Sequence, residues 1–198
     1  GLAKRKAVNL SRIFDAQGNY SFTDFPNFLE VYEAATSVLQ TPEDYAALTA
    51  AVLEASAEQG VIYTEVFLSP DFCGGGDLGA WREYLHAMSE AAASAQKTHR
   101  ITMRGIVTCI RHFGPTAARR IARCAAETAG DVIVGFGMGG NEAMGRQGDF
   151  AWAFDCAREA GLHLTTHAGE FAGPDSIRQA LDDLRVTRIG HGVRAIED

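Results

Sequence analysis

The sequence predicts an α/β protein built on a parallel β-sheet. Short apolar segments begin near residues 61, 102, 132, 163 and 188, and a stretch of helical character separates each from the next. Near-continuous apolar character is typical of strands that are buried on both faces, as in parallel sheets. This alternation, at a spacing of roughly 25–40 residues, fits either a doubly wound sheet or a (β/α)8 barrel.

A TIM (β/α)8 barrel is favoured, because no Gly-x-Gly-x-x-Gly motif opens a helix as it would in a dinucleotide-binding sheet. Five strands cannot close an eight-stranded barrel, so we expect a barrel present only in part, with about five of its eight strands. Residues 1–198 would then form a single domain, the central part of the barrel. The open edges of such a sheet would favour self-association.

The first 60 residues are predicted to be mainly helical. Residues 1–8 are basic and helical in character, and a turn signal follows at 17–19. Apolar and aromatic residues recur at helical spacing over 25–39, which predicts a helix whose aromatic side chains either pack in a core or lid or line a substrate pocket. Thr41 can cap the next helix, which begins with proline and two acids and is expected over 42–59.

The rest of the chain is predicted to alternate strands with helices. The strand expected over 61–69 contains Glu65, whose carboxylate needs a partner such as an arginine or backbone amides if it is buried. The glycine-rich loop 73–77 lacks the lysine and hydroxyl residue of a phosphate loop. Further strands are expected over 102–110, 132–136, 162–167 and 188–191, and helices over 78–98, 115–128, 149–160 and 174–184.

Composition and charge restrict the class of protein. The chain has 198 residues, of which 46% are hydrophobic, and this suffices for one packed core. Its net charge of −7 is spread without a basic run, which argues against nucleic acid or an anionic membrane as a partner. Charges interrupt the apolar helical stretches, so no membrane span is expected. The scattered thiols fit a reduced, cytoplasmic protein and form no Cys-x-x-Cys zinc pair: Cys73, Cys109, Cys124 and Cys156.

The stretch 162–170 combines a strand with groups that can bind metal and move protons. Alternation along the strand places His163 and His167 on one face. Gly169 permits a tight turn, so Glu170 can fold back toward His167. A neutral imidazole is a zinc ligand, and a nearby carboxyl group can transfer a proton. A histidine that is only hydrogen-bonded would give the same pattern.

A second histidine, His191, follows another short strand and lies between Gly190 and Gly192, which leave room for a substrate to approach it. Because ligands bind at the carboxyl ends of parallel strands, we expect the two histidine strands to contribute to one site. The glycine-rich stretch 137–142 either brings backbone amides close to a flat ligand or forms a simple turn. Arg111-His112 either reaches the same site or forms a structural ion pair.

Two motifs together resemble the adenosine deaminase family of metal-dependent hydrolases: Thr-His-Ala-Gly-Glu at 166–170 and Arg-Ile-Gly-His-Gly at 188–192. Glu65-Val66 with Ser69-Pro70, and Gly140-x-Glu142, support the resemblance. The resemblance implies a zinc-dependent barrel enzyme of purine metabolism. Such an enzyme converts adenosine or deoxyadenosine, with water, to the inosine nucleoside and ammonia, and holds one zinc ion per active site.

The resemblance also implies roles for four residues. His167 matches a zinc ligand, and Glu170 matches the carboxyl group that protonates N1 of the purine. His191 matches the histidine that orients the zinc-activated water and assists its deprotonation, and Gly140 matches the glycine whose amide meets purine N3. The expected partner is thus a small purine nucleoside.

The chain departs from the family's pattern in several places. This chain contains neither the His-x-His of the family's first strand nor the aspartate of its last strand. In the family these residues complete the metal site. Phe67 stands where many members carry arginine, and Gly137 where many carry aspartate. Two alternatives therefore stay open: a deaminase of adenine or another 6-aminopurine, and a catalytically inactive fragment or binding module that lacks most metal ligands.

Overall fold

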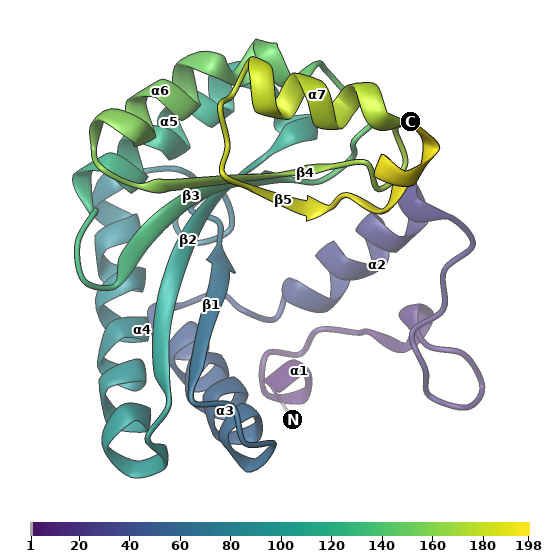
Figure 1. The fold of residues 1–198 in the computed structure, drawn as a ribbon. Coiled ribbons are helices and arrows are strands. Elements are labelled where there is room, and N and C mark those ends of the chain that lie inside the picture. The colour runs from purple at the N-terminus through teal and green to yellow at the C-terminus, as the bar shows by residue number, and fades with distance from the viewer. Residues whose placement is uncertain (1) are drawn as a thin grey trace.

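The computed structural model describes residues 2–198, and its centre is a five-stranded parallel sheet in the order β1-β2-β3-β4-β5. A doubly wound sheet reverses its strand order, whereas this order follows the chain from one edge to the other. The sheet is curved (Figure 1), and it forms part of a (β/α)8 barrel, as the sequence predicts. The strands are β1 (Tyr63–Leu68), β2 (Thr102–Ile110), β3 (Ile133–Gly139), β4 (His163–Ala168) and β5 (Arg188–His191).

Helices precede the sheet and connect its strands. Helices α4 to α7 cover the outer face of the curved sheet, and α2 lies apart from them, near the carboxyl end of β5 (Figure 1). Within residues 2–198 no helix has the length and apolarity needed to cross a membrane. The α-helices are α1 (Leu2–Arg5), α2 (Phe25–Thr36), α3 (Pro42–Glu58), α4 (Leu78–His99), α5 (Gly114–Glu127), α6 (Ala151–Glu159) and α7 (Pro174–Asp182). The short 3-10 helices are η1 (Ser11–Ile13), η2 (Arg111–Phe113), η3 (Gln147–Phe150) and η4 (Val193–Glu197).

Side-chain caps fix where three of the helices begin. The Asp24 carboxylate accepts a hydrogen bond from the Asn27 amide at the start of α2, and Asp77 does the same for α4. Thr41 and Asp44 form a reciprocal capping box at the start of α3, the helix that the sequence predicts from this motif. Each such cap stabilises its helix by about 1 kcal/mol.

The main core lies between the outer face of the sheet and the helices that cover it. Phe136 of β3 and Phe154 of α6 are fully buried, and their rings meet edge to face with centroids 5.1 Å apart. Trp81 of α4 and Ile121 of α5 are also fully buried. Each such side chain contributes about 1.5–3 kcal/mol on burial, so this core holds β2, β3 and β4 firmly in place.

All four cysteines are free thiols, as the sequence suggests, and Cys73, Cys109 and Cys124 are buried. Burial raises the pKa of Cys73 to about 12, although a hydrogen bond with Tyr45 opposes this shift. The protonated, buried thiol has no nucleophilic character, so these cysteines act as small apolar residues.

Strand β3 is longer than predicted. The glycines at 137–139 suggested a loop after residue 136, but Gly137, Met138 and Gly139 pair in register with the last three residues of β2. A Cβ atom on Gly137 would lie 3.1 Å from Cγ2 of Thr165, so a crowded barrel interior explains the missing side chain. In contrast, the helix predicted over 25–39 ends earlier, at Thr36.

Strand β1 lies at an edge of the sheet, and its inward-facing side is only partly buried. Tyr63 and Phe67 are each about half exposed. Glu65 finds the arginine partner that its position demands, because Arg188 of β5 donates to its carboxylate over 2.7 Å. The Tyr63 hydroxyl donates to the other carboxylate oxygen over 2.9 Å. The ion pair therefore links the first and last strands across the interior of the curved sheet.

Candidate functional site

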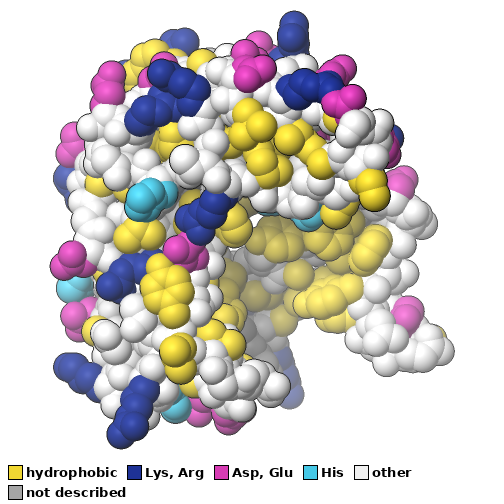
Figure 2. Space-filling view, in the orientation of Figure 1, with side chains coloured by type: hydrophobic (Ala, Val, Ile, Leu, Met, Phe, Trp, Pro, Cys, Tyr) yellow, Lys and Arg dark blue, Asp and Glu magenta, His cyan; other side chains and the backbone are white. Residues whose placement is uncertain are grey.

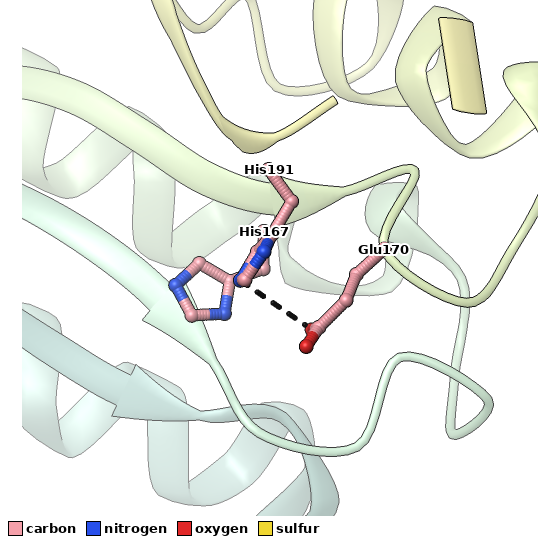
Figure 3. A group of neighbouring side chains, drawn as sticks. All are labelled: His167, Glu170 and His191. Carbon is pink, nitrogen blue, oxygen red and sulfur yellow. Dashed lines mark ion pairs between the residues drawn. The ribbon is translucent and has the colours of Figure 1, made fainter. Parts of the chain in front are cut away.

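Three side chains with metal-binding or proton-transfer chemistry converge at the carboxyl ends of β4 and β5 (Figure 3). His167 belongs to β4, His191 is the last residue of β5, and Glu170 comes from the loop that follows β4. The imidazole rings of the histidines meet edge to face with centroids 4.8 Å apart, and Nε2 of His191 lies 3.5 Å from Oε2 of Glu170. One donor atom from each residue lies within 4.8 Å of the others.

Glycines on both neighbouring strands make room for the His167 ring. A Cβ atom on Gly139 would lie 3.2 Å from Cε1 of this ring, and one on Gly190 would lie 2.6 Å from Cδ2. The sequence suggested that Gly190 leaves space for a substrate beside His191. The structure places the His167 imidazole in that space, so Gly190 fixes the position of the first histidine.

His167 is held as a neutral imidazole. Burial lowers its pKa, the neighbouring His191 and Arg111 lower it further, and Glu142 opposes the shift. The backbone carbonyl of His167 accepts hydrogen bonds from Nη2 of Arg111 and Nε2 of Gln147, both over 3.1 Å. A neutral ring on a fixed backbone is the form in which histidine binds a metal.

His191 has a strained backbone. Its φ angle is +67°, a left-handed conformation that a residue with a Cβ atom adopts at a cost of about 1–2 kcal/mol. Gly192 follows at φ +64°, and its amide donates to the Ala168 carbonyl over 2.9 Å. Strain of this kind concentrates at functional sites, where the surrounding structure maintains it.

The Glu142 carboxylate lies beneath the loop that carries Glu170. The sequence marks Glu142 only through its resemblance to the family, because a lone acid in a glycine-rich loop has no distinctive local pattern. In the structure it accepts hydrogen bonds from four consecutive amides, residues 169–172. Arg111 is also buried and donates to backbone carbonyls of His167 and Glu142. The Arg111 side chain therefore supports the site from below.

A pocket of about 840 Å³ extends from this cluster, and hydrophobic side chains gather around the hollow in Figure 2. Phe25, Phe28 and Tyr32 of α2 line it, so pocket lining is the alternative that the structure supports for these aromatic residues. Phe25 also contacts Phe171, which follows Glu170, with ring centroids 4.6 Å apart. Phe67 lies in the same pocket, edge to face with His167 at 6.1 Å.

Gly140 lies in the pocket wall beside His112. Its φ angle is +101°, and a Cβ atom there would lie 2.7 Å from Nδ1 of His112, so both the conformation and the space require glycine. The Asn141 amide donates to the same Nδ1 atom over 3.3 Å. Of the Arg111-His112 pair, only His112 lines the pocket. His163 is exposed at the amino end of β4 and takes no part in this pocket.

Comparison with known proteins places this geometry in a family. The family model described as "Adenosine deaminase" matches residues 3–198. The chain belongs to the adenosine deaminase family. Within this family, it is 46% identical over 196 residues to an adenine deaminase of Chelativorans sp. (strain BNC1), covering 99% of this chain and 60% of the relative. It is also 46% identical over 185 residues to an adenine deaminase of Agrobacterium fabrum, covering 93% and 57%.

Solved structures agree with this family assignment. An adenine deaminase from Arthrobacter aurescens is 31% identical, with a TM-score of 0.87, and the match covers all of this chain and 60% of that one. A zinc-bound amidohydrolase from Burkholderia ambifaria is 25% identical, with a TM-score of 0.77 over 85% of this chain and 48% of that one. The chain thus spans about 60% of the length of the curated relatives it matches.

Proposed function

We propose that the protein containing this chain is a hydrolase that replaces the 6-amino group of a purine with oxygen and releases ammonia. The convergence of His167, Glu170 and His191 in one pocket of an adenosine deaminase family chain carries this proposal. The sequence alone predicts adenosine as the first candidate substrate. Two relatives at 46% identity and a solved structure that matches over the whole of this chain are adenine deaminases, which favours adenine as the substrate.

The donor set fits a divalent metal such as zinc. His167 offers a neutral imidazole nitrogen, and the other donor atoms of the cluster lie within 4.8 Å of it. A neutral imidazole is a ligand type that catalytic zinc sites use, and the ligands besides His167 would come from outside this cluster. We assign His167 as a metal ligand and keep Glu170 and His191 for proton transfer. When bound, the metal would polarise a water molecule and lower its pKa from 15.7 to about 7.

The residues of this chain would divide the reaction among them. Water adds to C6 of the purine while electrons move toward N1, and Glu170 donates a proton to N1 where this charge develops. His191, 3.5 Å from Glu170, orients the attacking water and accepts its proton. The Gly140 amide donates a hydrogen bond to N3 of the ring. The protonated His191 then passes its proton to the amino group, which leaves as ammonia as its bond to C6 breaks. The hydroxyl group on C6 loses its proton to the Glu170 carboxylate, which restores the acid, and the product is a 6-oxopurine.

The apolar pocket suits a flat aromatic substrate. Its aromatic lining excludes water around the purine ring, which strengthens the few polar contacts that orient it. A volume of about 840 Å³ also leaves room for a ribose, and this observation keeps adenosine as the second candidate substrate.

The test compares substrates and one variant in the full-length, metal-loaded protein. We expect turnover of adenine to exceed that of adenosine in an assay of ammonia release. Glu170→Gln should keep the metal and lose at least about 100-fold in kcat, because general acid catalysis contributes on the order of 10²–10⁴. Glu58→Gln, at an exposed position on α3, serves as the matched control. Near-normal turnover by Glu170→Gln would remove this carboxyl group from the chemistry.

A further inference from the structure

The Glu142 carboxylate is the centre of a dense group of hydrogen bonds beside the candidate site. Glu142 lies in the loop after β3 and is only 4% exposed. One oxygen accepts from the Gly169 amide and the Ser176 hydroxyl, each over 2.7 Å. The other accepts from the amides of residues 170, 171 and 172 over 2.7–3.0 Å. Five donors from the segment 169–176 thus converge on one buried carboxylate.

These hydrogen bonds determine the path of the loop that carries Glu170. The backbone amide of Glu170 donates to the Glu142 carboxylate. The side-chain carboxyl group of Glu170 points toward His191, with Oε2 3.5 Å from Nε2 of the imidazole. Gly169 makes the turn at φ +70°, where a Cβ atom would lie 2.6 Å from Ile177. The loop is therefore fixed on both sides, and small changes in its path would move the Glu170 carboxyl group.

The carboxylate stays ionised in this buried position. Burial alone would raise the pKa of Glu142, but the amides of Ala172 and Phe171, the Ser176 hydroxyl and the Gly169 amide together lower it below its usual range. Arg111 adds a positive charge nearby, and its guanidinium donates to the carbonyls of Glu142 and His167. The same network therefore holds both the His167 backbone and the Glu170 loop.

We propose that Glu142 is a positioning residue for the deamination: it gathers the amides of residues 169–172 so that the Glu170 carboxyl group is held beside His191 and the purine ring. This inference rests on the proposed function, in which Glu170 is the acid. Glutamine at this position has nearly the same shape, but its NH2 group would face amide N–H donors and repel them. The loop would then lose its fixed path without the loss of any group that touches the substrate.

The experiment uses the full-length, metal-loaded enzyme with adenine as substrate, in Glu142→Gln, Glu170→Gln and the double variant. We expect Glu142→Gln to lower kcat by about 10-fold to 100-fold, since a displacement of about 1 Å can cost this much. KM and metal content should change less than about threefold. Hydrogen exchange at the amides of residues 169–172 should accelerate. In the Glu170→Gln background the second substitution should cost little more, because both act through one group.

Ser176→Ala is the milder variant, because it removes one of the five donors and leaves the charge in place. It should lower kcat by a few fold, in the same direction, even if Glu142→Gln folds poorly. Equal losses from Glu142→Gln in both backgrounds, or unchanged protection of residues 169–172, would overturn the inference. Normal kcat for both Glu142→Gln and Ser176→Ala, next to an inactive Glu170→Gln, would overturn this inference alone. A fully active Glu170→Gln would overturn the proposed function as well.

Discussion

Two loops at the carboxyl ends of strands each contain a buried carboxylate, and the two carboxylates differ in their hydrogen bonds and in the direction of their pKa shifts. In the loop after β3, Glu142 accepts five hydrogen bonds, and its pKa is lowered. In the loop after β1, the Asp71 side chain is 8% exposed, and Oδ2 has no hydrogen-bond partner within residues 2–198. Its closest cation is Arg120, 3.9 Å from Oδ1, and burial raises its pKa.

The comparison shows that burial alone does not decide whether a carboxylate stabilises a fold. The Glu142 loop carries the candidate acid, and its donors replace water completely. The Asp71 loop carries no proposed catalytic group, and its carboxylate loses water without full compensation. A third carboxylate, Glu65, lies between these extremes, with one arginine partner and partial exposure. Three changes test this ordering in the full-length protein at constant metal concentration.

The largest effect on stability is expected at Glu142. Glu142→Gln should lower the free energy of unfolding by about 2–3 kcal/mol, because it leaves buried amides without an acceptor. Urea denaturation followed by circular dichroism measures this change. A loss below about 0.5 kcal/mol would mean that the loop finds other acceptors, and the contrast with Asp71 would fail.

Asp71→Asn should raise the free energy of unfolding by about 1 kcal/mol at neutral pH. An uncharged amide of similar shape avoids the cost of burying a poorly compensated charge. The same denaturation experiment applies, with Asp131→Asn at an exposed position as the control for amide substitution. A destabilised Asp71→Asn would reveal a stronger interaction of this carboxylate than the contact with Arg120.

The stability contributions of Glu142 and Asp71 should depend on pH with opposite signs. Because the folded-state pKa of Glu142 is lowered, its contribution is present above the ordinary value of 4.5 and is lost as the pH falls through the folded pKa. Because that of Asp71 is raised, its protonated form favours folding below 3.8, and this advantage is lost as the pH rises through the folded pKa. Stability differences between wild type and each variant, measured from pH 3 to pH 7, should therefore change in opposite directions.

The smallest effect is expected at Glu65. Glu65→Gln should cost less than about 1 kcal/mol, because Arg188 is half exposed and solvent screens the pair. Thermal denaturation in low and high salt measures it, and salt should reduce the difference between variant and wild type. A loss above about 2 kcal/mol would show that the contact between the first and last strands matters more than its exposure indicates.

Much of the fold follows from local sequence patterns. The capping box at Thr41 and the apolar runs of the strands act over a few residues, so they could be read directly. The partner of Glu65 could be described only as a class, because Arg188 lies 123 positions away. The predicted end of β3 is wrong because glycine is locally a turn signal, whereas here the crowded barrel interior requires glycine within the strand.

The site was partly readable for the same reason. His167, Glu170 and His191 lie in two short motifs, and parallel strands bring their carboxyl ends together. The roles of Glu142 and Arg111 depend on backbone groups of residues far along the chain, and a side chain that binds backbone leaves no complementary residue type to recognise. The aromatic residues of α2 were ambiguous because core and pocket-lining helices share one spacing.

Alternate residues of β3 that face the barrel interior, Gly135, Gly137 and Gly139, have no side chain. Of these three, Gly139 lines the cavity, so the strand presents only backbone there, and a side chain on Gly139 would press against the His167 ring. Substitutions that are meant to admit larger molecules should leave this strand unchanged and replace the large aromatic side chains of α2 that line the pocket with smaller ones. Selection for smaller ligands should also leave this strand unchanged, because a methyl group on Gly137 or Gly139 would crowd Thr165 or the His167 ring.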